Sequence, residues 1–230
     1  SLGLSLADIE KSFTKQYIDF FRNCAKKFNL HIVAGTHPTY VENKIENCAY
    51  FFTPSGQHYV QSKIHLVPNE RADFAGMQNK VSIFKMGSIK IAILVCYDIE
   101  FPELVRIVAK AGVDVIFVPT YTSDLHGFFR VGLCAQARCI ENHVYVVKAS
   151  LVGRNLDFLD CAQGYGDAAI YSPCDVMFPQ GGILASGPLN ETFVAIADLN
   201  ISLLELARSK GNTTPLSHIK DQYITQEISI

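Results

Sequence analysis

Apolar residues recur along this chain with two periods, one typical of helices and one typical of strands. Near the start, Ser5 and Asp8 form a capping pattern ahead of an apolar stripe with helical spacing, which predicts a helix whose aromatic face lies in the core. The stripe contains Ile9, Phe13, Tyr17, Phe20, Phe21, Cys24 and Phe28. Further helices are predicted at 101–111, 127–142 and 203–208.

Strand-like runs lie between these helices. Two antiparallel hairpins are predicted, 48–53 with 59–66 and 82–86 with 89–95, because a turn containing glycine separates each pair. Single strands are predicted at 31–35, 113–118, 144–149 and 192–197. This mixture of hairpins and strand–helix–strand units predicts one α/β domain with mixed sheets and helices outside them.

Composition narrows the range of functions. The 230 residues are 49% apolar and 18% charged with a formal net charge of −2, which argues against a disordered chain and a basic nucleic-acid-binding face. The longest apolar run, at 89–95, is too short to span a bilayer, and the N-terminus has no basic segment followed by an apolar core. We therefore expect a soluble, cytoplasmic protein with neither nucleic-acid nor membrane partners.

Seven cysteines, an odd number without a Cys-x-x-Cys pair, favour reduced thiols in a cytoplasm over a disulfide framework. The histidines are dispersed and show no metal-ligand spacing, so no metal or other cofactor is expected. Six of the cysteines are interpreted as packing residues.

The seventh, Cys96, stands where the buried strand 89–95 stops and a helix is about to begin. A strand end holds a side chain in one place, and the turn after it directs free backbone N–H groups toward whatever the thiol attacks. This position predicts a nucleophile. The alternative is a small buried hydrophobic residue, which is the commoner role of a free cysteine.

Two other segments carry charged residues in places that suit a site. Lys63 lies in a strand-like run and Glu70 follows the proline that ends it, a layout that can direct both side chains into one pocket. Most such pairs are surface contacts, which is the alternative interpretation. Arg138 and Glu141, in the third segment, are expected to form a structural ion pair.

Together these three segments resemble the carbon–nitrogen hydrolases of the nitrilase superfamily. The matching residues are Lys63, His65, Leu66, Pro68, Asn69 and Glu70, then Cys96, Tyr97, Asp98, Phe101, Pro102, Glu103, Leu104 and Arg106, then Ala137, Arg138, Glu141 and Asn142. The resemblance extends over nearly the whole chain. It implies a four-layer α-β-β-α sandwich with two mixed sheets.

The resemblance implies a thiol hydrolase that cleaves a non-peptide C–N bond of a small amide or nitrile through a thioester on Cys96. Lys63 and the backbone N–H of Tyr97 would stabilise the oxyanion, and Glu70 would hold the lysine or the substrate. Tyr121 and Thr122 occupy the usual pocket-lining place, and an ordered loop is the alternative for both.

Family members also carry a general-base glutamate on an upstream Phe-Pro-Glu-like segment, after an opening strand–helix–strand unit. Residues 1–230 begin at what resembles the following helix, where Glu10 lacks the strand-end setting, and Glu103 follows the nucleophile instead of preceding it. We therefore expect a single hydrolase domain over 1–230 that is N-terminally incomplete, and slow turnover by these residues alone.

The resemblance also suggests a branch and a partner. Segments 134–138 and 171–175 look most like a branch in which some members carry an N-terminal acetyltransferase-like domain. Family members associate through helices flanking the nucleophile, here 101–111 and 127–142, so a homodimer or larger homo-oligomer is expected.

Two other functions remain open at this point. A non-catalytic protein of the same fold would serve as a binding or assembly module. A Cys/His thiol hydrolase would use a histidine as the base, and His65 and His126 are the nearest candidates in sequence.

Overall fold

The first helix, α1 (Leu6–Phe28), begins at the predicted capping box. Ser5 Oγ accepts a hydrogen bond from the Asp8 amide at 3.2 Å, and the Asp8 carboxylate accepts one from the Ser5 amide at 3.0 Å. The computed structural model describes residues 5–75, 79–156, 161–220 and 224–228. Within the apolar stripe, Phe13, Phe20 and Phe28 are largely exposed, so the prediction that all its aromatic residues lie in the core is wrong for these three. The sheet beneath α1 covers only one face of the helix.

That sheet has three antiparallel strands, β1 (Ile32–Val41), β2 (Lys44–Phe52) and β3 (His58–Ser62). The predicted hairpin is confirmed, with Cys48 opposite Ser62. Strand β3 ends before the predicted limit at 66, because the backbone amides after Lys63 turn away from the sheet. Those of Ile64 and His65 donate to the Asp98 carboxylate instead of to a strand.

The central sheet has six strands in the order β11-β10-β7-β6-β5-β4. They are β4 (Ile83–Met86), β5 (Ile89–Ile93), β6 (Val115–Thr120), β7 (Tyr145–Ser150), β10 (Ala168–Tyr171) and β11 (Ile183–Ser186). Strands β5, β6 and β7 are parallel and the other pairs are antiparallel, so this sheet is mixed as predicted. A separate two-stranded sheet joins β8 (Gly153–Leu156) to β9 (Cys161–Gly164).

The remaining helices cover the far side of the central sheet or its end. They are α2 (Pro102–Lys110), α3 (Leu125–Asn142), α4 (Ile201–Lys210) and α5 (Pro215–His218), with 3-10 turns η1 (Pro68–Ala72) and η2 (Cys96–Glu100). The three longer helices confirm the predictions to within a few residues.

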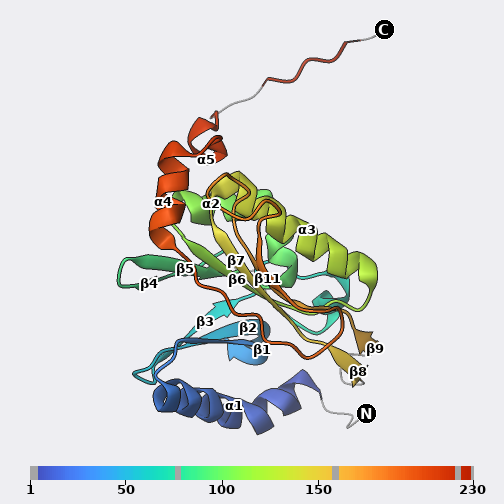
Figure 1. The fold of residues 1–230 in the computed structure, drawn as a ribbon. Coiled ribbons are helices and arrows are strands. Elements are labelled where there is room, and N and C mark those ends of the chain that lie inside the picture. Colours follow the sequence, from blue (N-terminus) through green and yellow to red (C-terminus); the bar gives the residue numbers. More distant parts are fainter. Residues whose placement is uncertain (1–4, 76–78, 157–160, 221–223, 229–230) are drawn as a thin grey trace.

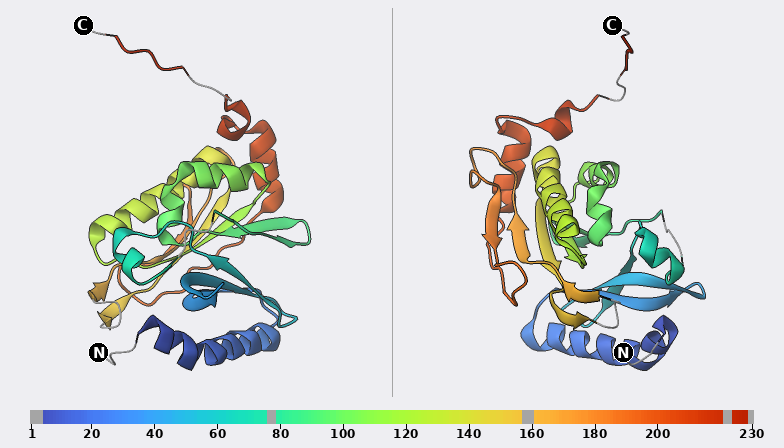
Figure 2. Two further views of the ribbon diagram at one scale, coloured as in Figure 1. Left: turned by 180° about the vertical axis from the view of Figure 1, so that it is seen from behind. Right: turned by 90° about the vertical axis from the view of Figure 1, so that its right-hand side faces the viewer.

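The layers run from α1 through the three-stranded sheet and the central sheet to α2 and α3, as Figures 1 and 2 show. Strand β5 explains the stacking. Ile91 and Ile93 pack between the two sheets, whereas Ala92 and Leu94 pack against α2 and α3. A strand buried on both faces has a continuous apolar sequence. The predicted four-layer sandwich is confirmed, although the three-stranded sheet is wholly antiparallel.

The predicted strand at 192–197 does not form. This stretch has no assigned strand conformation, and Val194 and Ile196 are 75% and 82% exposed. Its β-type sequence has no hydrogen-bonded neighbour among the described residues, and pairing is what makes an extended chain a strand. Strands β8 to β11 escaped prediction because glycine- and proline-containing loops interrupt their apolar runs. None of the described helices has the length and apolar character needed to cross a membrane.

Arg208 attaches α4 to the amino-terminal ends of the parallel strands of the central sheet. Its guanidinium donates to the Asp114 carboxylate at 2.7 Å and to the carbonyls of His143 and Val113 at 2.9 and 2.8 Å. Asp114 also accepts from the Lys90 amide at 2.9 Å, so one arginine joins the starts of β5, β6 and β7 to the helix. Charge-assisted hydrogen bonds of this kind are among the stronger polar contacts.

Replacing Arg208 with alanine should lower the free energy of unfolding by about 2 kcal/mol, because several partly buried acceptors lose their donor. Urea denaturation followed by circular dichroism measures the change. Lys210→Ala is the matched control, since Lys210 is exposed on the same helix. Equal losses in the two variants would contradict the role given to Arg208.

Candidate active site

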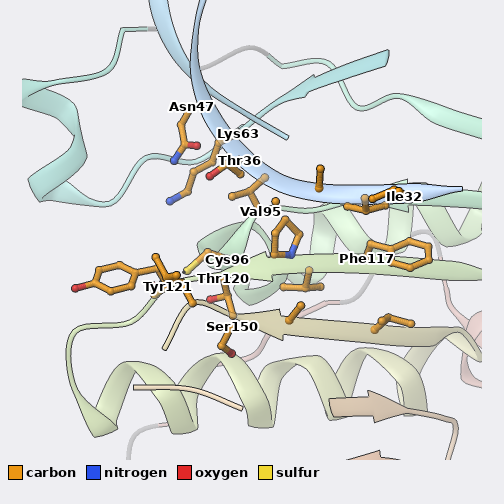
Figure 3. Close-up of a pocket in the computed structure, with 18 of the residues that line it drawn as sticks. Ile32, Thr36, Asn47, Lys63, Val95, Cys96, Phe117, Thr120, Tyr121 and Ser150 are labelled. Carbon is orange, nitrogen blue, oxygen red and sulfur yellow. Dashed lines mark hydrogen bonds between the residues drawn. The ribbon is translucent and has the colours of Figure 1, made fainter. Parts of the chain in front are cut away.

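A cavity of about 640 Å³ opens between the two sheets, at the carboxyl ends of the parallel strands. One wall comes from the first sheet and carries Thr36 and Asn47, while the other comes from the central sheet and carries Thr120 and Ser150. Figure 3 shows Cys96 between them, with Lys63 facing it from the side of the first sheet. Clefts at this end of a parallel sheet are common binding sites, because the loops there diverge.

Cys96 is the first residue of η2 and follows Leu94 and Val95, which extend the chain beyond β5. Its φ of 51° lies in the left-handed region, which costs a non-glycine residue about 1–3 kcal/mol. The thiol lines the cavity, and Sγ donates to the Tyr121 carbonyl at 3.4 Å. Strain of this kind at a strand end is typical of functional residues that must project from the backbone.

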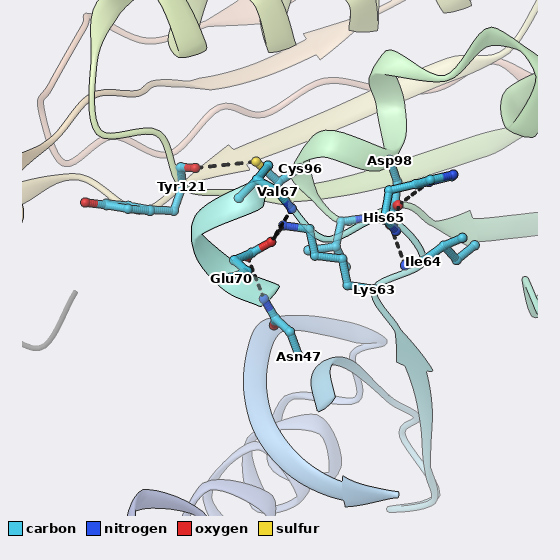
Figure 4. Close-up of polar contacts among 10 residues, drawn as sticks. Asn47, Lys63, Ile64, His65, Val67, Glu70, Cys96, Asp98 and Tyr121 are labelled. Carbon is cyan, nitrogen blue, oxygen red and sulfur yellow. Dashed lines mark hydrogen bonds and ion pairs between the residues drawn. The ribbon is translucent and has the colours of Figure 1, made fainter. Parts of the chain in front are cut away.

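Lys63 and Glu70 both line this cavity, and they form the ion pair that Figure 4 shows. Lys63 Nζ lies 2.5 Å from Glu70 Oε2, and the lysine is only 4% exposed. Glu70 also accepts from the Val67 amide at 3.0 Å and from Asn47 Nδ2 at 3.3 Å. The alternative of a solvated surface pair is therefore wrong, because the lysine side chain is buried. The carboxylate of Glu70, itself held by two further donors, fixes the position of the Lys63 ammonium.

Asp98 joins these two parts of the site. Its carboxylate accepts from the amides of Val95 and Ile64 at 3.1 and 3.2 Å, and from the His65 amide at 2.7 Å. Burial raises the pKa of Asp98, and these hydrogen bonds oppose that shift. The residue before Cys96 and the two residues after Lys63 are thus held by one carboxylate.

Arg138 supports η2 from α3. Its ion pair with Glu141, at 2.9 Å, confirms the predicted structural pairing. Beyond that prediction, the buried guanidinium also donates to the carbonyls of Ile99 and Glu100, both at 3.1 Å. The end of η2 is therefore fixed to α3.

The other candidate residues fall in different places. Tyr121 lines the cavity, whereas Thr122 is not among the lining residues, since its hydroxyl donates to the Tyr165 carbonyl at 2.6 Å. Tyr97 follows Cys96 in η2 and packs its ring edge-to-face on Phe101, at a centroid distance of 4.9 Å.

Neither histidine candidate is paired with Cys96. His65 lies with Nδ1 2.9 Å from Asp98 Oδ1 and stacks on Phe101 at a centroid distance of 3.6 Å. Within the described part of the chain, the Cys96 thiol has a hydrogen bond to a carbonyl and none to a histidine. This geometry argues against a Cys/His pair.

Four of the other described cysteines differ from Cys96 in their surroundings. Burial raises the pKa of Cys48 to about 11 and also raises those of Cys134 and Cys139, which disfavours their thiolates. Cys174 is exposed and lies outside the cavity, so the interpretation of the other six cysteines as packing residues is wrong for Cys174.

Sequence reasoning missed Thr36, Asn47 and Ser150 as cavity residues and Asp98 as the link. Asp98 belonged to a recognised motif, but three of its four contacts reach a segment more than 30 residues away. Only the packing of the two sheets brings these residues together.

Several known proteins are similar to this chain in sequence. Residues 6–209 match the carbon–nitrogen hydrolase family. The chain is 38% identical over 205 residues to the probable hydrolase YhcX of Bacillus subtilis, covering 89% of this chain and 40% of that protein. It is 29% identical over 205 residues to the deaminated glutathione amidase of Synechocystis sp., covering 83% of this chain and 72% of that protein.

A solved structure shows the same fold. Saccharomyces cerevisiae Nit3, a member of branch 10 of the nitrilase superfamily, superimposes with a TM-score of 0.75 at 26% identity, covering 89% of this chain and 72% of that one. With a family match across most of its length and a shared fold, this chain belongs to the carbon–nitrogen hydrolase family of the nitrilase superfamily.

Proposed function

We propose that this protein is an amidase whose nucleophile is Cys96. The observation that carries the proposal is that a strained cysteine at a strand end and a buried Lys63–Glu70 pair line one cavity. A thiol, a fixed positive charge and an apolar-walled space are what nucleophilic cleavage of a small amide requires.

The proposed reaction has two halves. Cys96 Sγ attacks the amide carbon, and the oxygen of the tetrahedral intermediate takes its negative charge beside the Lys63 ammonium and the Tyr97 backbone N–H. The C–N bond then breaks, ammonia or an amine leaves with the thiol proton, and a thioester remains on Cys96. Water hydrolyses the thioester, which releases the acid and restores the thiol.

The proton carrier is a separate question. Glu70 already holds Lys63, Asn47 and the Val67 amide, so it is the positioning carboxylate of the lysine. Following the family resemblance, we assign no glutamate of residues 1–230 as the general base. Residues 1–230 by themselves should then acylate faster than they turn over, because the hydrolytic water lacks its activator.

Amides are the favoured substrates. The similar proteins include an (R)-stereoselective amidase of Pseudomonas sp. and an omega-amidase of Xenopus tropicalis. Nitriles fit the same Cys96 and Lys63 chemistry. Tyr121, on the cavity wall beside Cys96, is proposed to contact the acyl group.

The two alternatives lose support for different reasons. A Cys/His hydrolase needs a histidine on the thiol, and His65 is instead bound to Asp98. A non-catalytic module would require neither the strained left-handed backbone at Cys96 nor a buried lysine that lines a cavity. Lack of acylation at Cys96 would favour the non-catalytic module again.

We also propose that the protein is a homo-oligomer that associates through α2 and α3. Large apolar side chains are exposed on these helices, including Ile107 at 61%, Phe129 at 56% and Leu133 at 63%. Phe129 and Leu133 are four residues apart and so share one helix face. On the resemblance of segments 134–138 and 171–175, we further propose that the chain belongs to the branch with acetyltransferase-fused members.

Cys96→Ala should abolish acylation, since the thioester cannot form. The full 230-residue chain is mixed with p-nitrophenyl acetate, and the burst of p-nitrophenolate is measured together with ammonia release from a panel of primary amides. The wild type should give a burst of about one equivalent per chain followed by slow turnover. Cys174→Ala is the control and should keep the burst; a full burst from Cys96→Ala would refute the assignment.

Lys63→Met should lower the acylation rate by about 10²–10³-fold, because it removes one stabiliser of the oxyanion. Stopped-flow measurement of the same burst reports the rate, and circular dichroism confirms folding. Lys85→Met, at an exposed lysine of β4, is the control. An unchanged rate in a folded Lys63→Met chain would exclude this lysine from the mechanism.

Leu133→Lys should convert the proposed oligomer to monomer, because it places a charge in the middle of the apolar α3 face. Size-exclusion chromatography with light scattering gives the mass. Phe20→Lys is the control, since Phe20 is 62% exposed on α1, on the opposite side of the layers from α2 and α3 (Figure 1). The same mass for wild type and Leu133→Lys would argue against this face.

A further inference from the structure

The Cys96 thiol is held by a loop and not by a regular element. Its hydrogen-bond acceptor, the Tyr121 carbonyl, belongs to the connection between β6 and α3. Whatever fixes this loop therefore also fixes the direction of the thiol.

Thr122, the next residue, is bound twice to one distant residue. Its carbonyl accepts from the Tyr165 amide at 2.8 Å, and its hydroxyl donates to the Tyr165 carbonyl at 2.6 Å. The methyl side of Thr122 packs on α3, where a Cβ added to Gly127 would lie 3.1 Å from the Thr122 Cβ. Thr122 is thus clamped between the helix and the segment 164–167, called here the strap.

The strap itself is anchored at three points. Asp167 forms an ion pair with Lys148, whose side chain is 1% exposed, and its carbonyl accepts from the Ser150 amide at 3.2 Å. Gly166 exchanges two hydrogen bonds with Asn190, at 2.9 and 2.7 Å. Because a buried ion pair is costly to break, the Lys148 contact makes the strap a rigid support.

The strap also lies directly against the cavity wall. A Cβ on Gly166 would come within 2.2 Å of the Ser150 Cβ, so only glycine allows the strap to pass this close to a lining residue. The strap therefore contacts Ser150 directly, and it holds Tyr121 through the neighbouring Thr122.

We propose that Thr122 is a positioning residue for Cys96, and that its hydroxyl bond to the strap holds the Tyr121 carbonyl where it orients the thiol. The inference rests on the proposed role of Cys96 and extends it to residues outside the cavity. It gives Thr122, expected from sequence to line the pocket, a different task. Small displacements of a reacting group lower rates steeply, so a loosened loop should be visible in the reactivity of Cys96.

The test measures the rate at which iodoacetamide alkylates Cys96 in the full chain, located by mass spectrometry of peptides. Thr122→Val keeps the packing on Gly127 but removes the donor, and it should slow alkylation about tenfold. Thr122→Ser keeps the donor and should restore the rate to within about twofold of wild type. Thr39→Val, which removes a part-buried hydroxyl from β1 outside the cavity lining, should leave it unchanged.

Asp167→Asn gives a second route, because it weakens the strap without touching Thr122 and should also slow alkylation. Urea unfolding of each variant separates a local effect from general destabilisation. If Thr122→Val reacts like wild type while Cys96 reacts faster than the exposed Cys174, the strap has no such role and the nucleophile stands. If serine fails to restore the rate, the hydroxyl is not the cause. If wild-type Cys96 is no more reactive than Cys174, both proposals fail.

Discussion

The site depends on the buried carboxylate of Asp98. Three backbone amides and one imidazole converge on its two oxygens, and they come from two segments that belong to different layers. One segment carries Cys96 and the other carries Lys63. A carboxylate with this many donors cannot shift without leaving several buried amides unpaired, and each unpaired amide costs about 1–3 kcal/mol. The relative position of thiol and ammonium follows from that cost.

Around Asp98, further polar side chains fix the positions of Lys63 and of η2. Lys63 is directed by Glu70, Glu70 by Asn47 and its own turn, and η2 by Arg138. The left-handed backbone at Cys96 is tolerated because the turn is tied at both ends, by Asp98 at its start and by Arg138 at its finish. Strain persists only where the surrounding contacts outweigh it.

The walls of the cavity are a consequence of the same stacking. Apolar residues of β5 face both the helices and the first sheet, so the two sheets approach each other along most of their length. Toward the carboxyl ends of β6 and β7 the loops diverge, and the space between the sheets opens where Thr120, Tyr121 and Ser150 stand. The cavity that Cys96 lines thus lies where core packing gives way to loops.

Sequence patterns alone determined much of this architecture. The capping box of α1, the two hairpins and the helices after Phe101 and before Asn142 follow from local periodicity and turn chemistry, and the strand-end setting of Cys96 follows from the same signals. Such features depend on residues a few positions apart. The order of motifs added Lys63 and Glu70 as candidates, and a single α/β sandwich as the fold.

Only the tertiary structure decided which side chains meet. Local sequence carries no signal for contacts between residues more than 30 positions apart. Such contacts decide that the Thr122 hydroxyl binds the strap and that His65 binds Asp98 and not Cys96. The burial of Lys63 likewise follows from the packing of the two sheets. The same holds for 192–197, a strand-like sequence without a described neighbour, and for Phe20, apolar yet exposed. Periodicity reports which residues suit a strand or a core, but pairing and burial need a partner that another part of the chain must supply.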